Sequence, residues 1–500
     1  MATVMTKMMN VPPGTSPSFP SSSSSFSPPQ TISTQSSPSP SLPLRKIPGS
    51  YGWPLLGPIS DRLDYSWFQG PETFFKKRIE KYKSTVFRTN VPPTFPFFTD
   101  VNPNVVAVLD CKSFSHLFDM EVVEKKNVLV GDFMPSLKFT GNIRTSVYLD
   151  PSEPEHGKVK RFAMDVLKRS SKVWLTELLT NLDTLWDTVD KEISEKGKAS
   201  YLFPLQQCIF KFLSKSLAGA DPAKSPEIEK SGYAMLDRWL VVQLLPTVPI
   251  TAFQPLTEIF LHSFTYPFFL VSGDYKKLTE FIKKEGQEVI RRAETEFGLR
   301  EEETIHNLLF VLGFNAYGGF SVFIPTLINV IASDTTGLQE KLRKEARENG
   351  GSSLTFDSVN DMPLIQSVVY ETLRLNPPVP LQYARARKDF KLSSHDSMFE
   401  VKKGELLCGY QKLAMQDSKI FDDPENFKPD RFMGSGKELL NYLYWSNGPQ
   451  TGSPSESNKQ CAAKDYVTLS ASLIVAHMFR RYDSVTGDSS SITAVQKART

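Results

Sequence analysis

The sequence predicts a mostly α protein with a minor β part. Apolar residues recur at three- and four-residue spacing through most of the chain between residues 155 and 375, which is typical of helices that bury one face. Runs of β-branched and aromatic residues are short and begin near the N-terminal end. With 500 residues, of which 40% are hydrophobic, the chain can bury a large core.

The expected elements follow one another in a simple order. Residues 48–58 are rich in Gly and Pro and form a turn-rich entry to the domain. A short helix and two short strands come next, at residues 72–83, 85–89 and 97–101. Longer helices are expected at residues 157–196, 201–219, 275–297, 305–323, 336–349, 365–375 and 466–475. The apolar pattern fades after Tyr482.

Residues 1–44 have the composition of a targeting segment. They are dominated by Ser, Pro and Thr, contain no acidic residue and hold too few large apolar residues to form a core. No apolar region typical of a secretory signal is present, and the scarcity of Arg favours a plastid over a mitochondrion. We therefore expect residues 1–44 to be a disordered plastid transit peptide, with an ordinary flexible tail as the alternative. Residues 45–500 are expected to form the folded domain.

Charge and apolar content exclude several classes of protein. The formal net charge is +3, and because Lys7, Arg45 and Lys46 precede the first acidic residue, Asp61, the rest of the chain is near neutral. Nucleic acid is therefore a poor candidate partner. No stretch of about 20 uninterrupted apolar residues predicts a membrane span. The most apolar region, residues 240–271, is interrupted by prolines and suggests short buried helices or a pocket rim that touches lipid from one side.

The strongest chemical signal is a cysteine between a loop and a helix. The segment from Trp445 to Asp465 reads WSNGPQTGSPSESNKQCAAKD. Backbone N–H groups at the start of a helix favour the thiolate form of Cys461, which is the form that binds a haem iron. The other cysteines, Cys111, Cys208 and Cys408, form no C-x-x-C pair, and the six histidines form no metal-binding motif. Taken alone, a loop cysteine is more often a small buried hydrophobic residue.

Two upstream segments strengthen this interpretation. Glu371 and Arg374 are three residues apart on an expected helix and can form an ion pair. The segment FKPDRF supplies Arg431, which can join that pair in a buried network that braces the cysteine loop. This order of segments resembles the cytochrome P-450 superfamily over residues 45–495. The resemblance implies the cytochrome P-450 fold and haem b, iron protoporphyrin IX, with the Cys461 thiolate as axial ligand.

The cysteine loop also indicates a branch of that superfamily. It is longer than in ordinary monooxygenases, because an insertion separates Gly448 from Cys461, and Ala463 stands where a glycine is usual. Lys459 holds the basic position two residues before the cysteine. This loop is similar to that of the plant branch that metabolises fatty-acid hydroperoxides, which comprises allene oxide synthases, hydroperoxide lyases and divinyl ether synthases.

The helix expected to cross the haem supports this branch. It reads GFNAYGGFS from Gly313 to Ser321 and lacks the acid that oxygen-activating relatives use, since no Asp or Glu occurs between Glu303 and Asp334. The run Asp334–Thr336 copies an acid-Thr-Thr signature but is better explained as the cap of the next helix. In the resembling branch the residue matching Asn315 orients the peroxide. The alternative is an asparagine that bonds its own helix backbone.

Within the branch, two positions favour a lyase over a synthase. Leu129 precedes VGDFMP, where synthases tend to have Phe, and the NAYGGF run is similar to that of 13-hydroperoxide lyases. The resemblance therefore assigns Leu129, Ala316, Gly319 and Phe320 to the substrate pocket. It also assigns His156, Lys160 and Lys459 to the haem propionates.

The implied activity is the cleavage of polyunsaturated fatty-acid 13-hydroperoxides, by O–O homolysis and through a hemiacetal, into a C6 aldehyde and an oxo-acid of the oxylipin pathway. Such an enzyme needs no O2, NADPH or reductase. A chloroplast location is implied, with peripheral membrane contact as an option. An allene oxide synthase, a reductase-dependent monooxygenase and a haem-binding sensor are the alternatives. The preference between 9- and 13-hydroperoxides, the partner of the substrate carboxylate and the oligomeric state stay open.

Overall fold

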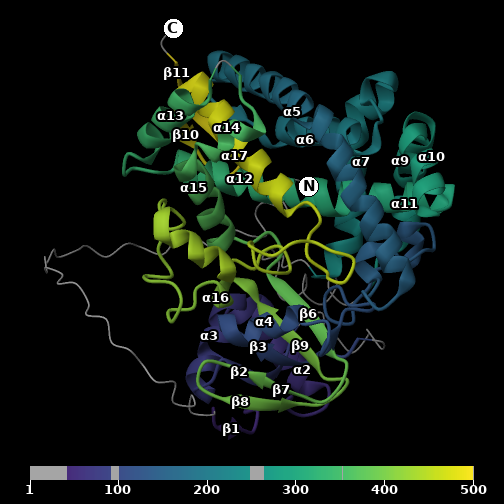
Figure 1. Ribbon diagram of the computed structural model, residues 1–500, viewed down its shortest axis with the longest axis vertical. Coiled ribbons are helices and arrows are strands. Elements are labelled where there is room, and N and C mark those ends of the chain that lie inside the picture. Colours follow the sequence, from purple (N-terminus) through teal and green to yellow (C-terminus); the bar gives the residue numbers. More distant parts are fainter. Residues whose placement is uncertain (1–41, 92–100, 248–263, 352, 499–500) are drawn as a thin grey trace, which may run out of the picture.

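The computed structural model describes residues 42–91, 101–247, 264–351 and 353–498. The expectation of a mostly α protein with a minor β part is confirmed. Figure 1 shows a helical body above a smaller part that is rich in strands. The helices of the body are α5 (Pro154–Lys196), α6 (Leu202–Ala218), α7 (Pro226–Leu244), α9 (Ser272–Glu285), α10 (Gln287–Phe297), α11 (Glu301–Phe310), α12 (Gly318–Ala332), α13 (Leu338–Asn349), α14 (Phe356–Asn360), α15 (Pro363–Leu375) and α17 (Lys464–Arg481).

The described residues form three sheets, and the strand-rich part contains two of them. The larger has the order β2-β3-β9-β6-β4, in which β3 runs parallel to β9 while β2 and β6 are antiparallel to their neighbours. The smaller has the order β1-β8-β7, so the chain is part of the fold from Leu44 on. The elements here are α2 (Leu56–Leu63), α3 (Pro71–Tyr82), α4 (Cys111–Ser115), α16 (Gln411–Ala414), β1 (Leu44–Arg45), β2 (Val86–Asn90), β3 (Asn104–Val108), β4 (Val123–Glu124), β6 (Leu381–Ala386), β7 (Phe390–Ser393), β8 (Met398–Val401) and β9 (Leu406–Tyr410).

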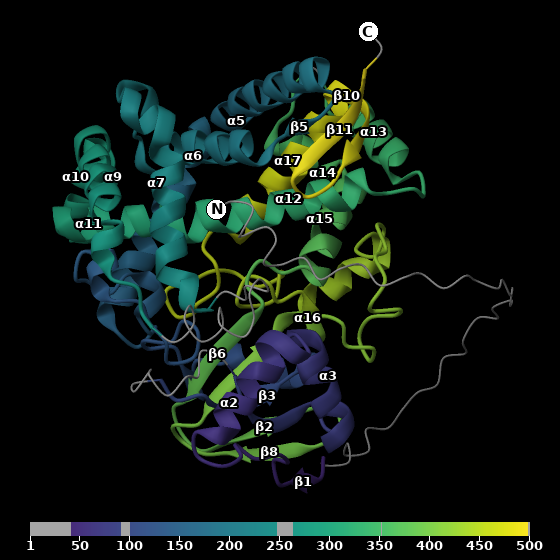
Figure 2. The ribbon, with the colours of Figure 1, turned by 180° about the vertical axis from the view of Figure 1, so that it is seen from behind.

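One long helical region crosses the helical body. It consists of α11, the π-helical segment η8 (Val311–Tyr317) and α12. It lies in the interior of the body, where α12 packs against α15 and α6 (Figures 1 and 2). A helix that is apolar on most sides belongs in a core, and Ile324, Leu327 and Ile331 of α12 are fully buried. The region Glu301–Ala332 has the length and mean hydropathy, 1.6, of a membrane span, but 61% of that window is buried inside the protein, as expected of a core helix.

Several expected elements differ in detail. The helix expected at 275–297 is two helices, because the chain bends at Gly286, where an added Cβ would lie 2.8 Å from the Ile282 carbonyl oxygen. The chain after α17 forms a hairpin of β10 (Tyr482–Gly487) and β11 (Ser491–Lys497), which pairs with β5 (Ala199–Ser200). The strand expected at 97–101 and part of the apolar region 240–271 lie outside the described residues.

Candidate active site

Cys461 lies three residues before α17, at the end of the long loop. Its backbone N–H donates to the Ser446 carbonyl at 2.8 Å, and its own carbonyl accepts from the Lys464 N–H at 3.2 Å. Burial raises the pKa of the Cys461 thiol, whereas the Ala463 N–H and the nearby Lys160 charge act in the opposite direction. A bound iron cation would further favour the thiolate form.

The loop is held by its own side chains. Gln460 donates to the Pro449 carbonyl at 2.6 Å, and Cβ atoms added at Gly448 or Gly452 would lie 3.0 Å from the Gln460 amide. Asn447, in the left-handed region at φ +63°, donates to the Lys459 carbonyl at 2.9 Å. The two glycines thus make room for one buried amide that ties both ends of the insertion together.

The other three cysteines have a different environment. Cys111, Cys208 and Cys408 are all buried in the core, whereas Cys461 is partly exposed. Burial raises the pKa of Cys208 and of Cys408 to about 12. Buried thiols of this kind behave as small hydrophobic residues, so Cys461 is the cysteine that a ligand can reach.

Glu371, Arg374 and Arg431 come together in a fully buried network. Both Glu371 carboxylate oxygens accept from Arg374, at 2.7 Å each, and Arg431 Nε lies 3.0 Å from Glu371 Oε1. The side chains of Glu371 and Arg374 are completely shielded from solvent. Arg374 also donates to the Met415 carbonyl at 2.9 Å, and Met415 Sδ accepts from the N–H of Tyr444, just before the cysteine loop. The network is therefore connected to the base of that loop.

His156, Lys160 and Lys459 also lie together, around the cysteine. Lys160 Nζ donates to the Gln460 carbonyl, beside Cys461, and His156 Nδ1 lies 3.0 Å from the Glu456 carbonyl oxygen. Burial, followed by the charges of the two lysines, lowers the pKa of His156 to about 4. Burial and the Lys160 charge lower the pKa of Lys459 to about 7.

Lys125 completes this basic cluster, and sequence reasoning missed it. It is 4% exposed, and its Nζ donates to Asn447 Oδ1 at 2.5 Å. Burial and the Lys459 charge lower its pKa to about 7. No motif distinguishes Lys125 from the many lysines that are simply solvated, so its burial became visible only in the folded chain.

This basic cluster, defined as Lys125, His156, Lys160 and Lys459, fits the acidic edge of a haem. Among the described residues, the three ammonium groups of the cluster bond only neutral acceptors. Lys459 Nζ donates to the Ser146 and Leu149 carbonyls at 2.7 and 2.8 Å, and Lys125 and Lys160 bond an amide oxygen and a carbonyl oxygen. Buried charges without a counter-charge are costly. The nearby acid Asp150 is already committed to Arg387 at 2.7 Å. Two propionate carboxylates would supply the missing negative charge, and Cys461 would supply the thiolate ligand that haem proteins of this type use.

Asn315 lies in the π-helical segment η8, where the Gly318 N–H donates to the Gly313 carbonyl five residues back. Single π-turns within α-helices are frequent at functional sites. Asn315 is exposed, and its amide makes no hydrogen bond with the residues that the structure describes. By contrast, Asn307 of the same helical region donates to the Glu303 carbonyl at 2.9 Å. The alternative of an asparagine bonded to its own helix therefore describes Asn307 and not Asn315.

Partly exposed positions at three- and four-residue spacing form a stripe along this mostly buried helical region. An added Cβ at Gly319 would meet no atom within 4 Å, and Ala316 at the edge of the stripe is half-buried. Phe320 lies differently, since it is 3% exposed and its ring packs against Phe212 of α6 at 6.0 Å. The structure favours a packing role for Phe320. The stripe comprises Val311, Asn315, Gly319, Val322 and Thr326.

Leu129 lies in the segment that follows Lys125. Its side chain is half-buried and packs against the main core. The segment then turns sharply at Gly131, with φ +59°, and the Phe133 N–H donates to the Val130 carbonyl at 3.1 Å. One short segment thus carries both a member of the basic cluster and the residue expected to steer the product.

Asp334 caps a helix. Its carboxylate accepts from the Leu338 N–H, the first residue of α13, at 2.9 Å, and from the Thr336 hydroxyl at 2.7 Å. The capping interpretation of the Asp334–Thr336 run is thus confirmed.

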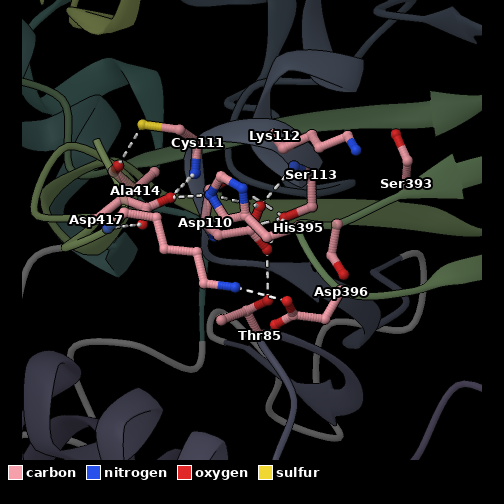
Figure 3. Close-up of polar contacts among 12 residues, drawn as sticks. Thr85, Asp110, Cys111, Lys112, Ser113, Ser393, His395, Asp396, Ala414 and Asp417 are labelled. Carbon is pink, nitrogen blue, oxygen red and sulfur yellow. Dashed lines mark hydrogen bonds and ion pairs between the residues drawn. The ribbon is translucent and has the colours of Figure 1, made fainter. Parts of the chain in front are cut away.

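A separate cluster brings three potential metal ligands together beside Cys111 (Figure 3). It consists of Asp110, His395 and Asp417. Both carboxylates already accept backbone N–H groups, at 2.8 and 2.9 Å, so we assign it no metal.

Comparison with known proteins agrees with this geometry. The cytochrome P-450 family model matches residues 333–450. A solved structure, retinoic acid bound cyanobacterial CYP120A1, superposes with a TM-score of 0.63 at 17% identity, covering 89% of this chain and 93% of that one, which supports the fold. The chain belongs to the cytochrome P-450 family, whose cofactor is haem held by a cysteine thiolate.

Comparison with individual proteins shows which kinds of family member the chain resembles more strongly. It is 63% identical over 479 residues to linolenate hydroperoxide lyase, chloroplastic, of Arabidopsis thaliana, covering 94% of this chain and 97% of the relative. It is 64% identical over 469 residues to fatty acid hydroperoxide lyase, chloroplastic, of Solanum lycopersicum, covering 93% and 98%. Identity to allene oxide synthase, chloroplastic, of Linum usitatissimum is 44% over 447 residues, covering 89% and 83%. Within the family, the chain thus groups with the hydroperoxide lyases.

Proposed function

We propose that this protein is a haem-thiolate lyase that cleaves polyunsaturated fatty-acid 13-hydroperoxides into a C6 aldehyde and an oxo-acid. The observation that carries the proposal is the environment of Asn315, which is exposed and makes no hydrogen bond with the described residues. It lies on a core helical region in which no Asp or Glu follows Glu303. The gap in identity between the lyases and the synthases among its relatives, 63% against 44%, supports the choice of reaction.

Each group has a separate task. Cys461 would hold the iron, the basic cluster would neutralise the propionates, and Glu371, Arg374 and Arg431 keep the base of the cysteine loop in place. When bound, haem supplies an iron that splits the O–O bond with electrons from the substrate itself, so that no NADPH, O2 or reductase is required. The Asn315 amide can donate to and accept from a hydroperoxide group, which fixes its direction. Leu129, Ala316 and Gly319 shape the space around the reacting carbons.

Product identification tests this proposal. The purified protein without residues 1–44 is given linolenate 13-hydroperoxide with no NADPH or reductase, and products are analysed by mass spectrometry. A C6 aldehyde and an oxo-acid are expected. Ketols from a hydrolysed allene oxide would identify a synthase instead, a need for NADPH and a reductase would identify a monooxygenase, and a thiolate-type spectrum without turnover would identify a sensor.

The proposed location is the chloroplast, with residues 1–44 as the transit peptide. Both lyase relatives carry the word chloroplastic in their names. Import into isolated chloroplasts, followed by sequencing of the new N-terminus, tests this. Cleavage near residue 44 is expected, and a full-length imported or excluded chain would contradict it.

We further propose that the protein touches a membrane through residues 53–68. Large apolar side chains that proteins usually bury are exposed here, with Trp53 79% and Leu56 68% accessible. Tryptophan is favoured at membrane–water interfaces. Flotation with vesicles of chloroplast lipids is expected to retain the protein and to lose it when Trp53, Leu55 and Leu56 become Ser. The control Val379→Ser removes an exposed apolar residue of another segment, and equal loss there would contradict the assignment.

A further inference from the structure

A column of aromatic rings leads from the helical segment that carries Asn315 to the surface. We call it the aromatic column, and it consists of Phe314, Phe310, Trp239, Tyr275 and His306. Phe314 stacks on Phe310 at 4.6 Å, and Phe310 packs edge-on against Trp239 at 6.3 Å. Trp239 stacks on Tyr275 at 5.9 Å, and Tyr275 stacks on His306 at 5.7 Å with ring planes only 5° apart.

The inner end of the column lies against the haem-crossing helix. Trp239 is 1% exposed, and a Cβ added at Gly313 would lie only 2.9 Å from its ring atom Cζ3. Gly313 is two residues before Asn315, in the same π-helical segment. The indole, which is one of the most easily oxidised side chains, is therefore packed directly on the backbone of the segment that carries Asn315.

The outer end has a base in place for a proton. The Tyr275 hydroxyl lies 2.6 Å from His306 Nδ1, within the range required for proton transfer. Burial lowers the pKa of His306 and raises that of Tyr275, so at neutral pH the phenol keeps its proton and the imidazole is free to accept one. His306 Nε2 lies 4.0 Å from Glu302, whose side chain is 74% exposed, which opens a route for the proton to solvent.

We propose that the aromatic column is an exit path for oxidising equivalents, ending in a radical on Tyr275. The inference rests on the proposed function, because hydroperoxide cleavage leaves a one-electron oxidant at the haem whenever the substrate radical escapes. That oxidant takes one electron from Trp239, and Tyr275 returns one electron to Trp239 while its hydroxyl proton passes to His306 Nδ1. The oxidant is reduced by one electron, and a neutral tyrosyl radical results. A soluble enediol reductant such as ascorbate then restores the phenol with one electron and one proton.

A second Trp–Tyr pair of the same fold supplies a matched control. Trp174 and Tyr466 lie edge-on at 5.1 Å. The Tyr466 hydroxyl, however, donates to the Leu167 carbonyl at 2.9 Å, and a backbone carbonyl cannot take up its proton at neutral pH. The two pairs therefore differ in whether the tyrosine hydroxyl is bonded to a base that can take up its proton, and the proposal depends on this base.

Freeze-quench electron paramagnetic resonance on the full-length holoenzyme tests the proposal. The holoenzyme is mixed separately with linolenate 13-hydroperoxide and with cumene hydroperoxide, which oxidises a haem-thiolate centre whether or not the protein is a lyase. A tyrosyl radical is expected from the unaltered protein and from Tyr466→Phe, and its loss from Tyr275→Phe. His306→Gln keeps an acceptor for the hydroxyl but no base, so the signal should be lost there as well while the Soret band is unchanged.

The outcomes separate the two proposals. Absence of any tyrosyl radical from the unaltered protein, or an equal signal from Tyr275→Phe, overturns the radical exit path. Loss of the signal from Tyr466→Phe also overturns it. The same samples are analysed for aldehydes. Aldehydes from linolenate 13-hydroperoxide without a radical leave the proposed function standing. A Tyr275 radical with cumene hydroperoxide, together with no aldehydes from linolenate 13-hydroperoxide, supports the exit path and contradicts the lyase activity.

Discussion

Substitution of Gly319 by Ala is predicted to move stability and activity in opposite directions. Glycine in a helix interior is about 1 kcal/mol less favourable than alanine. Since no atom lies within 4 Å of a Cβ added at Gly319, nothing offsets this gain. We expect the free energy of unfolding of the haem-free protein to rise by about 0.5–1 kcal/mol.

The same methyl group should impair turnover. Gly319 is four residues after Asn315, on the partly exposed stripe. Displacing a bound reactant by about 1 Å can lower its rate by about 100-fold. We therefore expect kcat/KM for linolenate 13-hydroperoxide to fall by about ten- to a hundredfold while haem content stays unchanged.

Gly313→Ala is the matched control. Its added Cβ would lie 2.7 Å from Leu236 Cδ1 and 2.9 Å from Trp239 Cζ3. Overpacking of this kind costs about 1–3 kcal/mol, which cancels or exceeds the helical gain. Urea unfolding followed by tryptophan fluorescence measures both variants. A Gly319→Ala protein that is destabilised, or that is stabilised and fully active, would refute the reasoning.

Three further predictions address other parts of the site. Asn315→Ala should lower kcat by about 100-fold without loss of haem. The control Asn307→Ala removes an amide that is bonded to its own helix and should stay active. Equal activity of the two variants would remove Asn315 from the mechanism. Leu129→Phe should shift products from aldehydes toward ketols, as seen by mass spectrometry, and an unchanged aldehyde yield would count against its steering role. Lys125→Met should release haem to apomyoglobin about tenfold faster, since residues around a metal site typically contribute that much to the affinity for the bound group. The control Lys112→Met changes an exposed lysine and should not release haem faster. Similar rates for the two variants would exclude Lys125 from the basic cluster.

Many of the helices could be predicted from the spacing of apolar residues, because a long amphipathic helix repeats the same three- and four-residue spacing many times. The expected helix at residues 157–196 corresponds to α5, Pro154–Lys196. The strands β3, β4 and β6 to β9 were not predicted. Two further differences have a clear physical reason. The break at Gly286 depends on a close approach to the Ala218 carbonyl, which is a tertiary contact. The hairpin β10–β11 is short and half-exposed, so its buried residues, such as Val485 and Ile492, are too few to produce a period.

The site was predictable where motifs place residues near one another in sequence. Glu371 and Arg374 share a helix turn, and the FKPDRF segment brings in Arg431. Lys125 was not predictable, because its position beside Asn447, 322 residues later, arises only on folding. The π-helical segment at Asn315 was equally hidden, since seven residues with hydrogen bonds to the fifth residue back are too few to change the apolar spacing.

The central claim is that the Cys461 thiolate carries the haem. The ferrous–carbon monoxide spectrum of the purified protein and of Cys461→Ser, recorded together with hydroperoxide turnover, tests it most directly. A thiolate-type Soret band and turnover are expected in the unaltered protein, and both should be lost in Cys461→Ser. A variant that keeps the same band and the same rate would contradict it.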